Sequence, residues 1–265
     1  MRKIIFITIV AFLSTFCANA QGTDTTSVHK ETLPFGKPCG DAHSIPKIEH
    51  SINVGVGIGA SSPIPIPNRI SEMSWAPHPC GILGYRLRYT LNSNLGLKTG
   101  LQLQHVGMSA KAKVYQMFTQ ATVEDAEVSG YFTGYNETKI NATYLSVPLL
   151  FSYKIIGTDW GVDAGVFVAL KIQGHFGGAV KDGYIRIDTP TGDRAEVGYE
   201  TFNFSKELNP FNFGLLFSAE REISQHWSGW LDLSWALTPT LKDTFQGLEY
   251  KMYNIYGFFG ISYNL

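Results

Sequence analysis

Six ionisable side chains stand at alternating positions inside segments that are otherwise apolar or small. The six residues are Arg86, Arg88, Lys98, Asp163, Glu220 and Asp232. Their types and spacing permit two kinds of chemistry. Charges of both signs that face a dry interior need partners, so we expect an internal ion-pair network in the lumen of the fold. A proton path or ion pore built from the same residues is the alternative.

The tripeptide Pro-Cys-Gly occurs twice, around Cys39 and around Cys80. After removal of a signal peptide these are the only cysteines, and pairs in an oxidising compartment usually bond. An intramolecular disulfide and free or intermolecular thiols both remain open. His43 and His78 lie near these cysteines, but their spacing matches no standard zinc pattern, so we expect no metal site.

Catalytic chemistry has little support in the sequence. The seven histidines are scattered, no serine occupies a nucleophile elbow, and no paired-carboxylate signature stands out. A hydrolase is nevertheless an alternative, because His105 and His175 are expected near Asp182 and Asp188 at one end of the strands described below. We therefore predict no catalytic residues, no cofactor and no enzymatic activity.

The six charged residues named first belong to eight segments in which apolar and polar positions alternate with period two. The segments are 52–59, 83–91, 95–104, 144–156, 162–170, 211–220, 227–237 and 255–265. Most are about 9–12 residues long, which suits a tilted transmembrane strand and exceeds the about 5–6 residues of soluble strands. The sequence thus predicts an all-β protein, an eight-stranded antiparallel transmembrane β-barrel.

The connections between these segments alternate in length. Short turns surround Ser93, Thr158 and Ser224, and the long connections are 61–79, 109–141, 173–210 and 238–252. Outer-membrane barrels have short periplasmic turns and long extracellular loops, which places both ends of the barrel on the periplasmic side. Within the long loops, 184–202 is predicted to form a hairpin that turns at Pro190, and such loops usually carry recognition.

The apolar face of the strands is expected to point outward into lipid. The other face holds Gly, Ser, Asn and Gln, which fits the narrow lumen of eight strands, whereas a soluble lipocalin-like barrel would reverse the two faces. Aromatic residues on the apolar face suit interfacial girdles, with ordinary core aromatics as the alternative. The girdle candidates are Tyr85, Tyr89, Tyr153, Trp227, Trp235 and Tyr263.

The first residues have the layout of a secretory signal peptide. Arg2 and Lys3 precede a short apolar run and a small-x-small site that ends at Ala20, with lipidation at Cys17 as a less favoured alternative. The expected organisation is a signal peptide at 1–20, a flexible periplasmic leader at 21–49 and the barrel at 50–265. Charged residues make up 16 % of the chain and the net charge is −1, so we expect no nucleic-acid partner.

The segment YLSVPLLFSYK, residues 144–154, resembles the Tyr-Leu-x-(Ile/Val)-Pro-Leu-Leu segment of the Bacteroidetes outer-membrane β-barrel family. That family includes PorT-like proteins and "porin family" proteins. WGVDAGVFVALKI (160–172) and YGFFGISYNL (256–265) look like its next and last strands, although Leu265 stands where the assembly signal usually has an aromatic. The resemblance implies an outer-membrane location, insertion by the barrel-assembly machinery, and no catalytic residues.

We therefore expect a non-enzymatic outer-membrane barrel that is structural or binds a partner through its long outer loops. A PorT-like accessory to secretion or envelope assembly is the first alternative, and a barrel hydrolase is the second. Expected partners are outer-membrane lipid, the assembly machinery, and an extracellular or envelope protein. Pro148 should point into the lumen at a bulge or local bend with one ladder bond absent, because a closed barrel has no edge strand.

Overall fold

The computed structural model describes residues 47–123, 126–245, 247–248 and 250–265, so the predicted signal peptide and nearly all of the leader lie outside the described range. Its strands are β1 (Ile48–Pro63), β2 (Ile70–Pro77), β3 (Cys80–Thr90), β4 (Leu95–Val123), β5 (Ala126–Lys154), β6 (Trp160–Ile187), β7 (Arg194–Asn203), β8 (Phe211–Glu222), β9 (Trp227–Ala236) and β10 (Met252–Asn264). A 3-10 turn, η1 (Ser205–Glu207), follows β7. No helix in the described ranges is long and apolar enough to cross a membrane.

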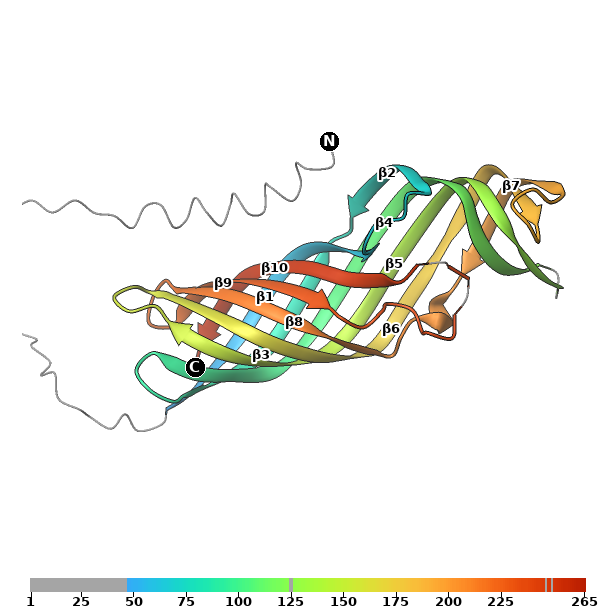
Figure 1. The fold of residues 1–265 in the computed structure, drawn as a ribbon. Coiled ribbons are helices and arrows are strands. Elements are labelled where there is room, and N and C mark those ends of the chain that lie inside the picture. The colour runs from blue at the N-terminus through green and yellow to red at the C-terminus, as the bar shows by residue number, and fades with distance from the viewer. Residues whose placement is uncertain (1–46, 124–125, 246, 249) are drawn as a thin grey trace, which may run out of the picture. The chain divides into compact units, whose positions relative to one another are not determined.

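Eight of these strands close into a ring through their pairing, and Figure 1 shows the ring as a barrel. Neighbours pair antiparallel in the order β1, β3, β4, β5, β6, β8, β9, β10, and β10 returns to β1 from Ser51↔Asn264 to Pro63↔Met252. Each of the eight strands contains one of the eight alternating segments, apart from one or two residues at the ends of some segments. The predicted all-β fold with an eight-stranded antiparallel ring is confirmed.

Three of the strands continue far beyond the predicted length. β4 and β5 have 29 residues each and β6 has 28, so much of the two longest connections is strand rather than loop. β2 pairs with β4 where β3 has ended, and β7 pairs with β6 where β8 has ended. The result is a five-stranded extension, β2–β4–β5–β6–β7, which we call the outer sheet.

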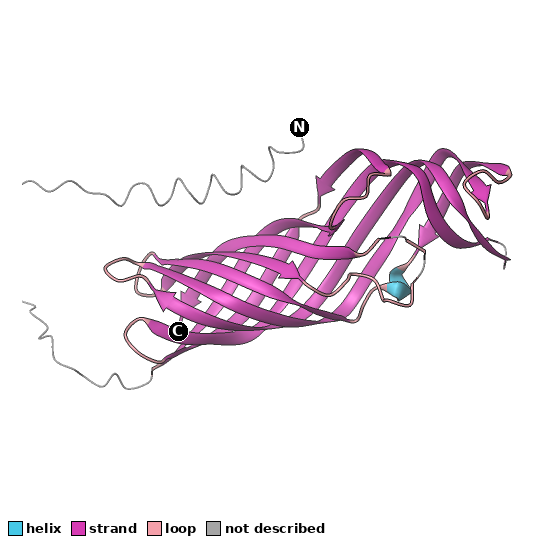
Figure 2. Ribbon diagram, in the orientation of Figure 1, coloured by secondary structure: helices cyan, strands magenta, loops and turns pink. Residues whose placement is uncertain are grey.

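The connections sort by length, as the sequence predicted (Figure 2). The short turns 91–94, 155–159 and 223–226 lie at the rim where β1 begins and β10 ends. The outer sheet and the 237–251 connection lie at the opposite rim. The predicted hairpin within 184–202 is confirmed, because β6 and β7 pair across the turn between Ile187 and Arg194.

Side-chain burial differs between the ring and the outer sheet. In the ring, outward positions are apolar and exposed, as for Leu149 at 57 %, while Lys98 and Asp232 are buried. A continuous exposed apolar belt around buried charges marks a lipid-facing barrel and rules out the lipocalin-like arrangement. In the outer sheet the order reverses, because Lys111 is exposed and Val114 is buried.

Pro148 lies in the barrel wall without a bulge. Its side chain is fully buried and points into the lumen, as predicted. Pairing with β6 stays in register at Pro148↔Phe167, while pairing with β4 is interrupted between Thr99 and Gln102 without a register shift. Thr99 Oγ1 donates to the Pro148 carbonyl oxygen at 2.9 Å. Of the predicted alternatives the bulge is absent, whereas the expected break in the ladder is present as a local gap in the pairing with β4.

Candidate functional site

Five of the six predicted lumen charges lie together inside the ring. Arg86 Nη2 donates to Asp232 Oδ2, and Lys98 Nζ lies 2.8 Å from Asp163 Oδ2 and 2.6 Å from Glu220 Oε2. We call these five residues the lumen cluster. Each comes from a different strand, and buried charges persist only when they are paired and hydrogen-bonded. Within the lumen cluster, one ion pair joins β3 to β9, and the two ion pairs of Lys98 join β4 to β6 and β8.

Arg88 does not belong to the lumen cluster. Its Nη1 lies 3.8 Å from Glu49 Oε2, and Glu49 is its register partner on β1. Alternation puts Arg88 on the same face as Arg86, but two residues along a strand move it about 7 Å toward the short-turn rim. Of the six charges predicted to form one network, five therefore pair in two groups inside the lumen, and Arg88 pairs with Glu49 at the mouth.

Aromatic side chains fill the lumen next to the cluster. The Arg86 guanidinium carbon lies 5.0 Å from the Trp230 ring centroid. Trp230 occupies space that two glycines leave free, since a Cβ on Gly55 would lie 2.6 Å from its ring and one on Gly260 would lie 2.8 Å away. The cavity at the short-turn mouth measures about 50 Å³, which has room for ordered water but not for a column of hydrated ions.

The six girdle candidates all lie on the outward face, with exposures of 39–46 %. Tyr89, Tyr153, Trp227 and Tyr263 stand near the short-turn rim, and the Trp227 and Tyr263 rings meet edge to face at 5.1 Å. Trp235 lies toward the other end of β9, and Tyr85 lies in the middle of β3. The exposure of all six rings excludes a packed core. The positions near a rim fit the predicted girdle, whereas Tyr85 lies between the two rims.

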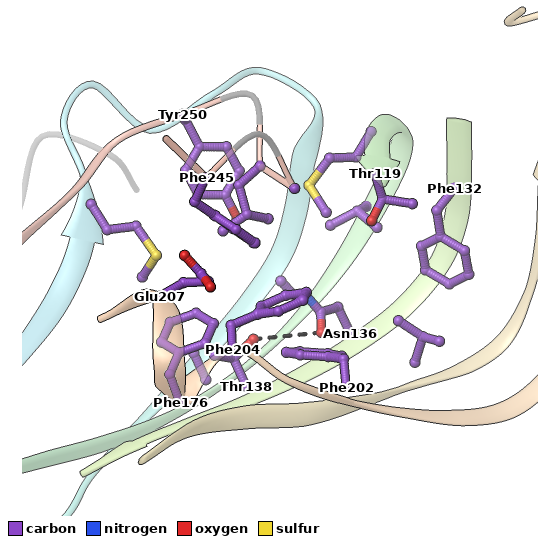
Figure 3. Close-up of a pocket in the computed structure, with 18 of the residues that line it drawn as sticks. Thr119, Phe132, Asn136, Thr138, Phe176, Phe202, Phe204, Glu207, Phe245 and Tyr250 are labelled. Carbon is purple, nitrogen blue, oxygen red and sulfur yellow. Dashed lines mark hydrogen bonds between the residues drawn. The ribbon is translucent and has the colours of Figure 1, made fainter. Parts of the chain in front are cut away.

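A cavity of about 1,090 Å³ opens inside the outer sheet, between that sheet, η1 and the 237–251 connection (Figure 3). We call it the outer cup, and its apolar lining includes Met108, Val114, Met117, Phe132, Phe176, Phe202, Phe204, Phe245 and Tyr250. Asn136, Thr138 and Glu207 are polar groups in the same lining. Its size and composition match those of small-molecule sites, which are mostly apolar with a few polar groups.

Four phenylalanines form one wall of the outer cup. The Phe204 ring centroid lies 5.9 Å from that of Phe176, 5.0 Å from Phe202 and 4.7 Å from Phe245. These residues come from β6, β7, the segment after β7 and the 237–251 connection, so the aromatic contacts fasten that connection to the sheet. Sequence reasoning missed the cup, because its residues fall in stretches interpreted as loops. The alternation of Phe202 and Phe204 was the one available signal.

The histidines of the hydrolase alternative bind hydroxyl groups. His105 Nδ1 lies 3.0 Å from Thr143 Oγ1, and His175 Nδ1 lies 3.1 Å from Ser205 Oγ. The Ser205 hydroxyl donates to Asn203 Oδ1 at 2.5 Å, so its proton does not point toward the imidazole. This arrangement closes the turn after β7 and does not activate a nucleophile.

The two aspartates of the hydrolase alternative have conformational roles. Asp182 and Asp188 have positive φ values of 46° and 60°, a backbone region that aspartate tolerates better than most residues. Asp182 lies where the β5–β6 register shifts, and Asp188 begins the β6–β7 turn. The predicted clustering of these aspartates with the histidines therefore receives no support from their contacts.

Cys80 is buried at the start of β3, and its Sγ accepts a hydrogen bond from Gly107 N at 3.3 Å. Cys39 and His43 lie outside the described residues, so the predictions about a disulfide and against a zinc site rest on the sequence there. His78 Nδ1 lies 3.3 Å from Asn141 Oδ1. Within the described ranges, no group of three or more His, Cys, Asp and Glu residues could hold a metal ion.

A family model described as an outer membrane protein beta-barrel domain matches residues 35–242. Among solved structures, the fold is similar to Ail, the attachment invasion locus protein of Yersinia pestis, at 9 % identity over 82 % of this chain and 97 % of that one, with a TM-score of 0.35. It is also similar to Neisserial surface protein A, at 8 % identity over 82 % of this chain and 97 % of that one, with a TM-score of 0.34. A third similar structure is the outer membrane protein OprG from Pseudomonas aeruginosa, at 11 % identity over 82 % of this chain and 95 % of that one, with a TM-score of 0.30. No curated protein matches the sequence.

Proposed function

The chain belongs to the outer membrane protein beta-barrel domain family, and from this premise we propose that it is a non-enzymatic binding protein that holds an apolar extracellular ligand in its outer cup. The observation that carries the proposal is the cup itself, a cavity of about 1,090 Å³. It lies at the rim opposite the short turns, which are periplasmic in such barrels. Apolar surface costs about 25 cal/mol per Å² in water, so a ligand that covers this wall is stabilised.

The lining defines the chemistry of the ligand. The stacked phenylalanines and the methionines suit an aliphatic or aromatic body, and methionine adapts its shape to different ligands. Asn136 and Thr138 lie side by side, with Thr138 Oγ1 donating to Asn136 Oδ1 at 3.5 Å. Glu207 Oε2 lies 3.8 Å from Lys242 Nζ. The ligand expected from these groups is an amphiphile with an apolar body and a small polar end.

In this proposal the ring is an anchor rather than a channel. The lumen cluster and Trp230 occupy the interior, and an eight-stranded barrel leaves little room beyond its own side chains. The wild-type protein should therefore give no stable conductance steps in planar bilayers.

A protein partner is the second candidate, and a free sheet edge favours it. Among the described strands, β7 pairs only with β6. An unpaired edge can accept a strand from another chain. A partner bound in this way would suit an accessory role in secretion or envelope assembly, like that of PorT-like members of the family.

The cup is tested with the protein in lipid nanodiscs and the fluorescent amphiphile N-phenyl-1-naphthylamine as probe. Ala110 lines the cup, and Ser109 precedes it on β4 outside the lining, so Ala110→Trp and Ser109→Trp make a matched pair. We expect saturable binding that Ala110→Trp weakens about tenfold, because the indole fills the site, and that Ser109→Trp leaves nearly unchanged. A heat-modifiability gel shows that each variant is folded.

Two results would reject the cup as the binding site. One is wild-type fluorescence equal to that of empty nanodiscs over the whole titration. The other is an equal loss of affinity in both folded variants, which would place the probe elsewhere.

A further inference from the structure

The outward face of the outer sheet carries a cross-strand row in which lysine and tyrosine alternate. Lys113 of β4 pairs with Tyr135 of β5, Tyr135 pairs with Lys181 of β6, and Lys181 pairs with Tyr199 of β7. The Lys113 Nζ lies 5.5 Å from the Tyr135 ring centroid, and Lys181 Nζ lies 5.5 Å from that of Tyr199. We call these four residues the Lys–Tyr ladder.

Positive charge exceeds negative charge around the Lys–Tyr ladder. Glu137 Oε atoms lie 3.7 Å from Lys111 Nζ, 3.8 Å from Lys139 Nζ and 3.4 Å from Lys181 Nζ, so one carboxylate faces three ammonium groups. Lys113 Nζ lies 3.8 Å from a Glu72 carboxylate oxygen. The four lysine side chains remain 43–68 % exposed. Four lysines against two glutamates leave this face positive, although the whole chain has a net charge of −1.

The spacing of the ladder favours a repeating anionic ligand. Neighbouring strands lie about 4.8 Å apart, so the backbone positions of Lys113 and Lys181, two strands apart, are separated by about 10 Å. This interval is close to the length of a disaccharide, and the exposed rings of Tyr135 and Tyr199 offer flat apolar surfaces to sugar rings. We propose that the Lys–Tyr ladder binds an acidic polysaccharide with one carboxylate or sulfate per one or two sugars.

The position of the ladder separates this ligand from a membrane headgroup. Leu103 is an exposed apolar residue of β4 in the lipid-facing belt, and Lys113 lies ten residues further along the same strand. Ten residues of strand extend about 33 Å, and less along the membrane normal when the strand is tilted. The ladder therefore stands beyond the headgroup layer. It lies on the face of the sheet opposite the outer cup, so this proposal does not depend on the ligand of the cup.

The test measures binding of the full chain in zwitterionic nanodiscs to polygalacturonate and heparin by biolayer interferometry, with neutral dextran as the reference. The charge-reversal variant is Lys113→Glu/Lys181→Glu. Its control is Lys47→Glu/Lys154→Glu, which makes the same change in net charge at the short-turn rim, away from both the ladder and the lining of the outer cup. A third variant, Tyr135→Ala/Tyr199→Ala, removes the stacking surface and keeps the charge.

We expect the wild type to bind both acidic polymers but not dextran, and to bind less tightly as salt rises. Lys113→Glu/Lys181→Glu should weaken binding at least about tenfold, while the control stays within about twofold. The tyrosine variant should weaken binding with an unchanged salt dependence, because stacking is not electrostatic. Absence of binding at low salt, an equal loss in the control, or binding to lipopolysaccharide micelles but to neither polymer would overturn the proposal.

Discussion

The ring and the outer sheet share three strands, yet they are turned inside out relative to each other. On β4 within the ring, Leu101 is half exposed and Gln102 is fully buried. Further along the same strand, Lys111 is exposed and Val114 is buried. The backbone alternation is the same in both parts, so the surroundings decide which face is apolar. Lipid surrounds the ring, and water surrounds the outer sheet.

The two interiors are stabilised by different forces. In the ring, buried carboxylates and cations are held by pairing with each other, since removal of one partner leaves an uncompensated charge. In the outer sheet the interior consists of aromatic and aliphatic side chains, such as Phe176 and Phe132, whose burial is favourable in proportion to area. Substitutions in the two interiors should therefore change the free energy of unfolding by different amounts. Only in the ring should the effects of two paired substitutions fail to add.

The largest expected effect is in the lumen cluster. Arg86→Met leaves Asp232 buried without its cation, and we expect the free energy of unfolding to fall by about 3–5 kcal/mol. Arg86→Met/Asp232→Leu removes both charges and should recover most of that loss. The measurement is urea unfolding in lipid vesicles followed by tryptophan fluorescence. If the effects of Arg86→Met and Asp232→Leu simply add in the double variant, the pair is not coupled as described.

A smaller effect is expected in the outer cup. Phe176→Ala leaves a cavity beside Phe204 and should cost about 3 kcal/mol. The loss should appear as faster amide hydrogen exchange in the outer sheet and leave the ring protected, because the two parts have separate cores. Val54→Ala on the lipid-facing belt is the control. Uniformly faster exchange in the ring and the outer sheet would show that they unfold as one unit.

The aromatic girdle should contribute less than either interior. Trp227→Ala removes an edge-to-face contact with Tyr263, and such pairs contribute about 0.5–1.5 kcal/mol beyond area burial. The expected loss of about 1 kcal/mol should depend on bilayer thickness, because an interfacial residue reports where the headgroups lie. An effect that is identical in thin and thick bilayers would contradict an interfacial position.

The smallest effect under ordinary conditions concerns pH. Burial raises the pKa of Tyr250 in the outer cup to about 12. The folded-state pKa lies above the value of about 10 in unfolded chains, so the associated stability is complete below about pH 10 and is lost as pH rises toward about 12 and beyond. The difference in 295 nm absorbance between wild type and Tyr250→Phe measures this titration. A titration midpoint near pH 10 would show that the Tyr250 side chain is exposed to solvent.

Much of the ring was predictable because its signals are local. Alternation at Val147, Leu149 and Phe151 identified a strand and its outward face, and short turns identified one rim. At Pro148 an interrupted ladder was expected and is found, but a bulge and a local bend both stayed open, because the sequence does not show whether a proline shifts the register or only interrupts one ladder. The outer sheet was predicted only in part. The hairpin within 184–202 was expected, but the continuation of β4, β5 and β6 into one sheet was not, because that sheet also needs β2 as a partner of β4.

The candidate sites were less predictable. The six lumen charges were identified by type and face, but Arg86 and Asp232 lie 146 residues apart in sequence, and nothing local assigns one to the other. Arg88 shares the face of Arg86, and its different partner depends on a displacement of two residues along β3. The phenylalanine wall and the Lys–Tyr ladder each combine residues from several strands, so neither exists until the register is set.

By itself, the sequence determined an all-β chain with eight alternating strands, two rims of unequal loop length, and an apolar face turned outward. These properties follow from period-two alternation and turn spacing, which neighbouring residues encode. The tertiary structure alone decided which lumen charges pair, where β4, β5 and β6 leave the lipid-facing belt, and how the outer cup and the Lys–Tyr ladder form on opposite faces of one sheet. These properties depend on register between strands distant in sequence, because a shift of one residue would move every side chain to the other face.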